Sequence, residues 1–394
     1  MFLSLIVLTI VSLISFSILL ESSKHSTLSD LLSGKPANKY VLISTSVQES
    51  KDFYTIYLPV VCQAWLKIHF QPIVVLVLSD SFIRPSNGSS RHFRTRLNLM
   101  QLKVIEYLKR MPQVKIYYFT AKPGYDVATG MLARMFVGFM TERYIESDND
   151  FVLLSDSDLV PIDATYYELP TDANVMANQI VIWNAHCCGN LSFRGKSYQQ
   201  YPMSHIGMTK RHWRRIIQFD MARQSTSLDD ATTYSFSSDS IERKLENFYN
   251  EANYMKKSAE IERGDRMWST DQFLMSVSIE EYAHAFGVSL DKRHYKGMRL
   301  DRSQSSDSWR SSIDSRFDML TDAHLYHDHI FVEPDLLSKL YKKLFNDPFV
   351  IEILDEYLNQ YILIRRLLFN NSNNNNTTNE TKNLILVNLE KNLE

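Results

Sequence analysis

The stretch Asp150-Phe-Val-Leu-Leu-Ser-Asp156-Ser-Asp158-Leu-Val-Pro-Ile162 decides both the fold of this chain and the place of its chemistry. Its run of large apolar residues predicts a fully buried strand that ends directly before two carboxylates. Residues i and i+2 of an extended chain point to the same side, so Asp156 and Asp158 face one way. Open α/β sheets bind ligands just past the C-terminal ends of their strands. Two like charges this close favour a bound divalent cation, which would hold a diphosphate and so predicts a nucleotide-dependent transferase.

The segments around this stretch alternate between strand and helix. Apolar runs predict buried strands over 40–46, 72–80 and 114–120, and helical spacing of apolar residues predicts helices over 52–70, 94–110 and 130–145. Farther along, we expect a strand over 173–183, a strand turning into a helix over 204–217, and an amphipathic helix over 347–369. The alternation predicts an α/β fold with an open, mostly parallel sheet over 38–165, flanked by helices.

The composition is that of an ordinary globular protein. Of the 394 residues, 44% are hydrophobic and 22% are charged, and the chain is long enough to bury a sizeable core. A net charge of −2 gives no sign of a polyanion-binding surface, which argues against nucleic acid as a partner. The 11 glycines form no Gly-x-Gly-x-x-Gly or Walker-type loop that would cradle phosphates.

The N-terminal run Phe2–Leu20 is uncharged and 19 residues long. A bilayer core is crossed by about 20 apolar residues, whereas a cleaved signal peptide has a shorter apolar region after basic residues and before small ones. We therefore predict an uncleaved signal anchor over 1–20, with a cleaved signal peptide as the alternative. Asn-x-Ser/Thr sequons, such as Asn87 in a loop rich in turn residues, favour a lumenal catalytic domain. The expected location is the Golgi or endoplasmic reticulum membrane, as a single-pass type II glycoprotein.

Three cysteines are too few for a disulfide framework. Cys187 and Cys188 are adjacent and Cys62 lies far off in the sequence, so one bridge from Cys62 to either of the pair would leave a thiol over. The triplet His186-Cys187-Cys188 contains residue types that bind zinc, but its spacing argues against a zinc site. Adjacent residues do not easily share a tetrahedral site, and the Cys-x₂-Cys spacing is missing.

The order of the predicted strands, helices and motifs along the chain resembles that of nucleotide-sugar-dependent glycosyltransferases of the GT-A fold. It is most similar to that of the galactosyltransferase superfamily that includes glycogenin. In that family an arginine on a helix precedes the acidic strand, as Arg134 does here. A Gly-Val-Met-type strand then leads into a Trp-bearing helix, as Ile206-Gly207-Met208 leads to Trp213, and an Asp-Gln pair before a helix is matched by Asp271-Gln272. The resemblance covers roughly residues 38–330. The family's His-x-x-Gly-x-x-Lys-Pro-Trp is only half matched, by His294-Tyr-Lys-Gly297-Met-Arg299, which leaves retention or inversion at the anomeric carbon open.

The resemblance implies a hexosyltransferase that uses Mn²⁺ or Mg²⁺ as a Lewis acid on the departing diphosphate. Asp156 and Asp158 would bind the metal and the nucleotide, and a histidine would complete the metal site. We favour His324 over His294 for that role. Arg134 would add a fixed positive charge near the nucleotide, the alternative being a surface or capping arginine.

Asp271 is the residue that we predict on the acceptor side. In an inverting reaction it would be the general base for the acceptor hydroxyl, and in a retaining reaction it would orient or stabilise the sugar. The alternative is an N-cap for the helix that begins at Gln272. Trp268 would offer an aromatic face for a sugar ring, whereas Asp301 and Arg302 are weaker candidates for the acceptor cleft.

The predicted organisation is a signal anchor (1–20), a stem (21–37), a catalytic domain (38–345), a C-terminal helix (346–369) and an Asn-rich tail (370–394). The catalytic domain would comprise a nucleotide-sugar-binding half (38–165) and an acceptor half (166–345). Its expected partners are a nucleotide-sugar donor, a glycan, protein or lipid acceptor and, through the N-terminal helix, a membrane. Two rival hypotheses stay open, because an isolated Asp-x-Asp is more often a solvated turn than a metal site. They are a catalytically inactive, membrane-anchored glycan- or nucleotide-binding protein, and a metal-dependent nucleotidyl- or phosphotransferase.

Overall fold

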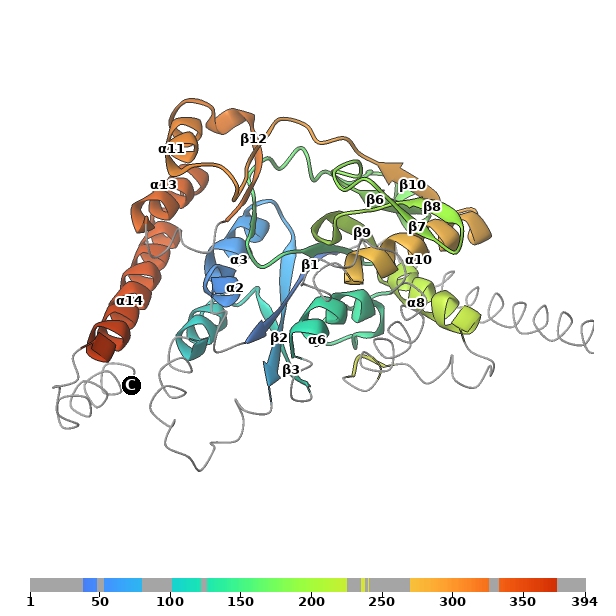
Figure 1. The fold of residues 1–394 in the computed structure, drawn as a ribbon, viewed down its shortest axis with the longest axis horizontal. Helices are drawn as coiled ribbons and strands as arrows, with labels where there is room; N and C mark the ends of the chain where they lie inside the picture. Colours follow the sequence, from blue (N-terminus) through green and yellow to red (C-terminus); the bar gives the residue numbers. More distant parts are fainter. Residues whose placement is uncertain are drawn as a thin grey trace, which may run out of the picture.

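A seven-stranded sheet forms the centre of the fold (Figure 1). The computed structural model describes residues 38–47, 53–79, 101–121, 126–224, 235–237, 240, 270–325 and 333–373. Within these ranges the sheet has the order β10-β6-β9-β4-β1-β2-β3, and β9 alone runs against its neighbours. The predicted α/β fold with a mostly parallel sheet is therefore confirmed, and the sheet continues past residue 165.

The strands fall into one large and two small sheets. Four parallel strands begin the large one, namely β1 (Lys39–Val47), β2 (Gln71–Ser79), β3 (Lys115–Ala121) and β4 (Phe151–Ser155). It is completed by β6 (Gln179–Ile182), β9 (Ile206–Thr209) and β10 (Ser289–Lys292). A three-stranded sheet contains β11 (Met298–Leu300), β12 (Leu320–His324) and β5 (Leu159–Pro161), and a hairpin contains β7 (Asn190–Phe193) and β8 (Lys196–Gln199).

Helices cover both faces of the large sheet. One face carries α2 (Phe53–Ile56), α3 (Leu58–Lys67), the helical residues 101–109, α11 (Ser306–Ser315), α13 (Pro334–Leu344) and α14 (Pro348–Asn373). The other face carries α6 (Asp126–Ala133), the 3₁₀ helix η1 (Arg134–Phe139), α8 (Lys210–Gln224) and α10 (Thr270–Phe286). Shorter connections include α7 (Ala173–Ala177), η2 (Met203–His205) and η5 (Phe317–Met319). The result is a three-layer arrangement of helix, sheet and helix.

The side chains of each central strand alternate between the two apolar cores. Val41 and Ile43 of β1 belong to the core on the α3 and α14 side, whereas Leu42 belongs to the core on the α6 and α8 side. All five residues of β4 are buried. A parallel strand covered on both faces needs a continuous apolar run, which is why the run before Asp156 predicted its position so well.

Two predicted helices are divided or shortened by local chemistry. The helix expected over 52–70 is split into α2 and α3, because Pro59 stands in the first turn of α3 and has no amide hydrogen to continue a preceding helix. The helix expected over 130–145 ends as η1, where Gly138 packs directly on the backbone of Arg214 in α8. A Cβ atom at Gly138 would collide with that backbone, so the close approach of the two segments depends on glycine.

The expected strand over 173–183 is half wrong. Its first part forms the short helix α7, because the Asp172 carboxylate accepts hydrogen bonds from the amide groups of Asn174 and Val175 and so caps a helical turn. The strand β6 begins only at Gln179. Over 204–217 the expected strand followed by a helix is confirmed as β9 and α8.

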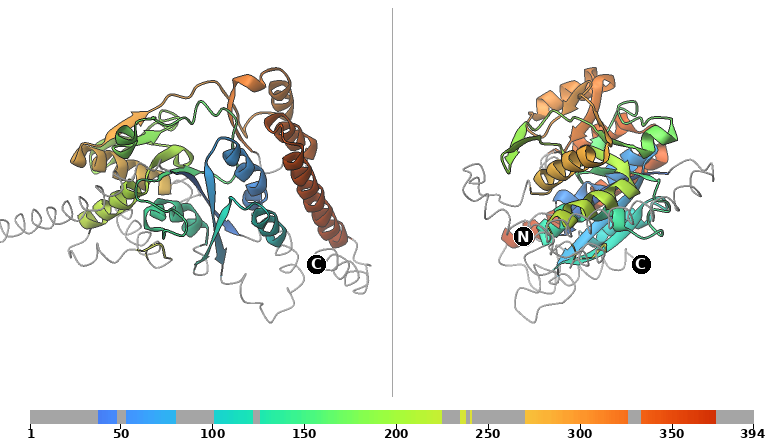
Figure 2. Two further views of the ribbon diagram at one scale, coloured as in Figure 1. Left: turned by 180° about the vertical axis from the view of Figure 1, so that it is seen from behind. Right: turned by 90° about the vertical axis from the view of Figure 1, so that its right-hand side faces the viewer.

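The C-terminal helices α13 and α14 form a column beside α2 and α3, which the view from behind in Figure 2 also shows. The Tyr357 hydroxyl of α14 donates to the carbonyl of Ile56 at 2.9 Å, and the Lys67 ammonium donates to the carbonyl of Leu344 at 2.5 Å. The helix expected over 347–369 is confirmed and extends to Asn373. It therefore belongs to the body of the protein.

None of the helices in the described ranges is long and apolar enough to cross a membrane. The longest of them, α14, carries charged residues such as Glu352, Asp355 and Glu356, because it buries only one side against the body. This finding contradicts the predicted localisation as a single-pass protein of the Golgi or endoplasmic reticulum membrane, which is corrected here. The run Phe2–Leu20 lies outside the described residues, as does the predicted stem.

His212 of α8 is a buried histidine that is held in its neutral form. Its Nε2–H donates to the carbonyl of Ala177 at 2.9 Å, which leaves Nδ1 to accept from the Tyr282 hydroxyl at 3.0 Å. A protonated ring would carry hydrogen on both nitrogens and could no longer accept that bond. Burial, assisted by the positive charge of nearby arginines, lowers the pKa of His212 from 6.5 to about 4.

We expect the free energy of unfolding to decrease as the pH is lowered from 7 to 4.5. Over this range the unfolded chain protonates His212 and the folded chain does not, so a stabilisation present above pH 6.5 is lost towards pH 4. The loss attributable to this residue is at most about 3 kcal/mol. Urea denaturation at several pH values measures it, with His212→Gln as the comparison because Gln can make both hydrogen bonds without titrating. An equal pH dependence in the variant would contradict the assignment.

Candidate metal and nucleotide site

Asp156 and Asp158 lie in the turn that joins β4 to β5, at the C-terminal end of the central strand. The small sheet fixes this turn from the other side, because β12 runs antiparallel to β5 with His324 opposite Leu159. The amide group of Leu325 donates to the carbonyl of Asp158 at 2.8 Å. The end of β12 is thereby fastened next to the two carboxylates.

This pairing brings Asp156, Asp158 and His324 into one cluster. Each residue offers an oxygen or nitrogen atom, and these atoms all lie within 4.8 Å of one another. His324 Nε2 lies 3.3 Å from Asp158 Oδ1, and Asp158 is only 4% exposed. Burial by itself would lower the pKa of His324, but the Asp158 carboxylate outweighs it and holds that pKa above its ordinary value. The cluster is compatible with metal binding.

His294, the other histidine considered for this role, lies against a different residue. Its ring stacks on that of His186 with the ring centroids 4.3 Å apart. Of the two candidates, the structure brings His324 to the carboxylates. The other histidines of the same stretch, His327 and His329, lie outside the described residues.

Arg134 connects the two predicted acidic groups. Its Nη1 donates to Asp156 Oδ1 at 2.6 Å, while Nη2 and Nε donate to Asp271 Oδ2 at 2.5 and 3.0 Å. The guanidinium is buried, which excludes the alternative of a surface arginine. Burial would raise the pKa of Asp156, but the contact with Arg134 dominates and lowers it to about 2. Asp156 is therefore ionised at neutral pH.

Asp271 is almost completely buried at the start of α10, with 1% of its surface exposed. Besides the two bonds from Arg134, its Oδ1 accepts a hydrogen bond from the amide group of Gln272 at 2.8 Å. Both carboxylate oxygens thus have partners, but the bond to Gln272 joins adjacent residues inside α10, which begins at Thr270, and is not the bond to the second or third helical amide group that an N-cap accepts. The predicted role on the acceptor side remains a prediction, and Trp268 lies outside the described residues.

A second buried charge network, which the sequence did not reveal, lies beside the cluster. Arg299 of β11 donates from Nε and Nη2 to the two oxygens of Asp322 of β12, at 2.7 and 2.9 Å. His205 Nε2 lies 3.3 Å from Asp322 Oδ2, and the hydroxyl of Tyr295 donates to Oδ1 at 2.8 Å. Arg299 and Asp322 are partners in the strand register, so only knowledge of which strands pair could have found them.

The network holds a permanent charge pair in the interior. Burial would raise the pKa of Asp322, but the hydrogen bonds from His205 and Arg299 hold it well below its usual range. Burial lowers the pKa of His205, which keeps that ring neutral at physiological pH. Asp322 therefore fixes the guanidinium of Arg299, whose side chain is 21% exposed.

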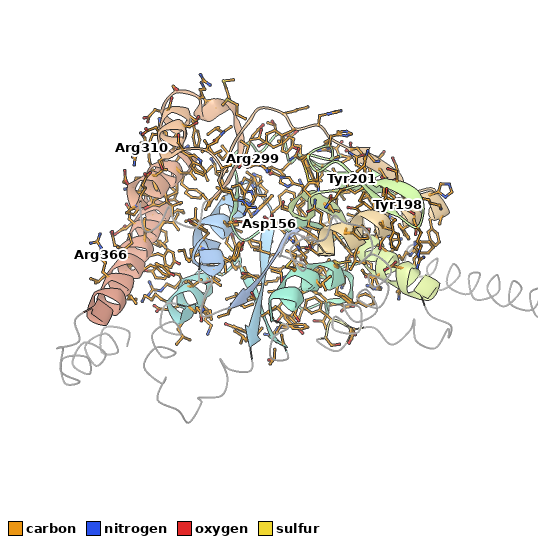
Figure 3. The ribbon with its side chains drawn as sticks, in the orientation of Figure 1. Asp156, Tyr198, Tyr201, Arg299, Arg310 and Arg366 are labelled. Carbon is orange, nitrogen blue, oxygen red and sulfur yellow. A yellow bond between two sulfur atoms is a disulfide. The ribbon has the colours of Figure 1, made fainter. Side chains whose placement is uncertain are left out.

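The metal-site cluster, Arg134, Asp271 and, from the second network, Arg299 line one cavity of about 360 Å³. This volume lies within the range of roughly 300–1,000 Å³ that is usual for small-molecule sites. Its charged lining comprises Arg134, Asp156, Asp158, Asp271, Arg299, Arg302 and His324. Asp156 and Arg299 lie in the middle of the molecule, away from Arg310 of α11 and Arg366 of α14 (Figure 3). Of the two weaker candidates, Arg302 lines the cavity, with Nη1 3.7 Å from Asp158 Oδ2, whereas Asp301 accepts hydrogen bonds from Ser303.

Comparison with known proteins adds little to this geometry. The sequence matches no known family profile and no curated protein. No family is shown. Among solved structures, the chain is similar to the apo structure of the bifunctional glycosyltransferase WbbM, at 12% identity and a TM-score of 0.35 over 82% of this chain, which spans about half (52%) of the WbbM chain. It is also similar to 4-diphosphocytidyl-2C-methyl-D-erythritol synthase, at 11% identity and a TM-score of 0.26, over 54% of this chain and 86% of that one. Likeness at this level identifies neither a substrate nor the galactosyltransferase superfamily that the sequence resembles.

Proposed function

We propose that this protein is a metal-dependent glycosyltransferase of the GT-A fold, which moves a sugar from a nucleotide-sugar donor to a glycan, protein or lipid acceptor. The observation that carries the proposal is the convergence of Asp156, Asp158 and His324 at the C-terminal end of β4, inside a cavity of suitable size. That position is where open α/β sheets bind nucleotides. The division into a donor half (38–165) and an acceptor half (166–345) belongs to the same proposal, because each half contributes residues to the cavity.

The residues of the cluster fit Mn²⁺ or Mg²⁺. Carboxylate oxygens are preferred ligands of both ions, and the His324 imidazole would add one nitrogen ligand to the two carboxylates. Asp156, Asp158 and His324 would hold the ion. When bound, such an ion acts as a Lewis acid on the oxygens of a diphosphate.

The arginines of the cavity supply fixed positive charge for the same group. Arg299 is oriented by its bidentate contact with Asp322, and Arg302 lies near Asp158. A guanidinium presents several donors in one plane, which suits the oxygens of a phosphate. Both side chains line the cavity, so they would bind the diphosphate and orient the bond that breaks between it and the sugar.

In this proposal, Asp271 positions the guanidinium of Arg134. Each of its oxygens is already engaged, by Arg134 or by the Gln272 amide group, which leaves no oxygen free to receive the proton of an acceptor hydroxyl, although burial holds the pKa of Asp271 above its ordinary value against the effect of Arg134. Its contact with Arg134 instead orients the guanidinium towards Asp156.

An Asp271→Asn variant distinguishes these two roles. If Asp271 positions Arg134, we expect kcat/KM for the donor to fall about 10- to 100-fold, as is usual for residues that orient a ligand-binding group. The shape of the pH profile should then stay the same. Loss of the limb of the profile that reports a deprotonated group would instead assign Asp271 as the general base.

The experiment that tests the proposed function is a hydrolysis screen of nucleotide sugars on the full chain. UDP-, GDP- and CMP-linked sugars are each incubated with Mn²⁺ and with a chelator, and the released nucleotide is measured. We expect turnover of one donor in Mn²⁺ and none in chelator. Nucleotide-sugar binding without turnover would indicate the inactive binding protein, and pyrophosphate release from a nucleoside triphosphate and a sugar phosphate would indicate the nucleotidyltransferase. Absence of both turnover and metal-dependent binding would overturn the proposal.

A further inference from the structure

The loop between β6 and β7 presents a disulfide to the cavity. Cys187 and Cys188 are bonded to each other, and both residues line the cavity wall. This pairing corrects the sequence-based expectation of a bridge from Cys62, which is a free, fully buried thiol of α3. The charged cluster and the arginines already have roles in the proposed function, whereas this sulfur surface has none.

The loop that carries the pair is tied to its surroundings on both sides. Before the pair, the amide group of Ala185 donates to the carbonyl of Arg293 at 3.1 Å, and the side-chain amide of Gln199 donates to the carbonyl of Ala185 at 2.6 Å. After it, the amide group of Gln200 donates to the carbonyl of Gly189 at 2.9 Å. The bond between adjacent cysteines also closes a small ring, which prevents both side chains from rotating. The two sulfur atoms are therefore presented as one fixed surface.

This surface is apolar, whereas the same cavity lining also contains the charged groups of the metal cluster and the arginines. The lining also contains the apolar residues Met131, Pro202 and Met203. Among the described residues of the lining, the one aromatic side chain is Tyr54, which belongs to α2 beside β1. Asn184 and Ser204 supply polar groups to the same lining as the sulfur pair.

A pyranose ring matches this combination of surfaces. Its hydroxyl groups form a polar rim, while the C–H bonds of its faces lose contact with water favourably only against an apolar surface. Ligand sites typically combine such apolar walls with a small number of polar groups that fix orientation. The charged lining residues, Asp156, Asp158 and the arginines, suit a diphosphate, so the disulfide is the part of the lining that we assign to a second sugar.

We propose that the Cys187–Cys188 disulfide is the wall against which the acceptor, a pyranose sugar, lies, and that reduction of this bond weakens acceptor binding. The inference rests on the proposed function and adds the acceptor class and its binding surface. In the reduction, a dithiol gives two electrons and two protons to the bond. The S–S bond breaks, two S–H groups form, and the dithiol closes into its own disulfide.

The first test counts thiols in the full chain. The protein is denatured without reductant, alkylated and weighed by mass spectrometry. We expect one label, on Cys62, and three labels when a dithiol is added before alkylation. Three labels without reductant would overturn the proposal, because the wall would not exist.

The second test measures sugar binding directly. Saturation-transfer NMR is used with the methyl glycosides of glucose, galactose, mannose and N-acetylglucosamine, on the oxidised protein, the dithiol-treated protein and the variant Cys187→Ser/Cys188→Ser. We expect at least one glycoside to bind the oxidised protein and its Kd to rise about tenfold in the other two, the size typical of a lost apolar contact in a pocket. The dithiol should have no further effect on the variant, which is the control for its action elsewhere. Lack of binding by all four glycosides, or an unchanged Kd after reduction, would overturn the proposal.

A third measurement separates this inference from the proposed function. Hydrolysis of the donor in Mn²⁺ without acceptor should be the same in the oxidised and reduced protein, because the proposal assigns the disulfide to the acceptor and the charged residues to the donor diphosphate. Equal loss of donor hydrolysis and glycoside binding on reduction would overturn the acceptor assignment. Disulfide-dependent glycoside binding without any donor turnover would instead remove the proposed transfer reaction and leave the sugar-binding wall standing.

Discussion

An Asp158→Asn variant should lose metal-dependent turnover of the donor by about 10³-fold, since a Lewis-acid cation supplies several kcal/mol of charge stabilisation. Asparagine has nearly the same shape as aspartate, but it removes the negative charge that faces His324 and Arg302. The buried position of Asp158 leaves little room for water to replace the lost ligand. Release of nucleotide from the donor found in the screen measures the effect.

Two further measurements make this expectation specific. Calorimetric titration with Mn²⁺ should show that the variant has lost most of its metal affinity, whereas an Asp318→Asn variant, which removes an exposed carboxylate, should bind and turn over as the unchanged protein does. Full Mn²⁺ affinity in Asp158→Asn together with lost turnover would mean that Asp158 does not bind the metal. Full turnover would remove the metal site from the mechanism.

An Asp322→Asn variant should lower the free energy of unfolding by about 3–5 kcal/mol, the usual cost of leaving one member of a buried ion pair without its partner. Asp322 is completely buried and accepts two hydrogen bonds from Arg299, so asparagine would leave the guanidinium without its counter-charge. The hydroxyl of Tyr295 would lose a charged acceptor as well. Urea denaturation followed by tryptophan fluorescence gives the difference.

The matched control is Asp335→Asn. Asp335 pairs with Arg310 at 2.6 Å, a distance similar to that of the buried pair, but its side chain is 67% exposed. Exposed pairs contribute little to stability because water screens them. We therefore expect little change in this variant, and equal losses in both variants would show that burial does not decide the importance of the Arg299–Asp322 pair.

The parts of the fold that the sequence predicted are those with local causes. The apolar run before Asp156 indicates a strand covered on both faces, and the alternation of such runs with amphipathic helices indicates a parallel sheet. The helix and strand boundaries that were predicted wrongly also have local causes in the sequence. Pro59 ends one helix and begins another, and Asp172 caps a turn inside an expected strand.

The parts that the sequence could not predict depend on contacts between distant segments. The family resemblance favoured His324 over His294, but it did not reveal the pairing of β12 with β5 that brings His324 to the carboxylates, nor the register of β11 and β12 that brings Arg299 to Asp322. Neither pairing leaves a mark in the residues themselves. The bond between Cys187 and Cys188 was not predicted either, because only a bridge from Cys62 to one of the pair was considered from the sequence.

Because β12 pairs with β5 beside the turn after β4, the cluster of Asp156, Asp158 and His324 is completed late in folding. The carboxylates emerge from the ribosome well before His324 and Leu325, and the amide group that closes the turn belongs to the later segment. Contacts between segments so far apart in sequence form slowly, because the long intervening chain must first be ordered. A nascent chain that ends before β12 would contain the central strand β4 but would lack His324, the third residue of the proposed metal site. In refolding experiments, Mn²⁺ binding should therefore appear after the core tryptophans have become buried, and simultaneous appearance of both signals would argue against this order.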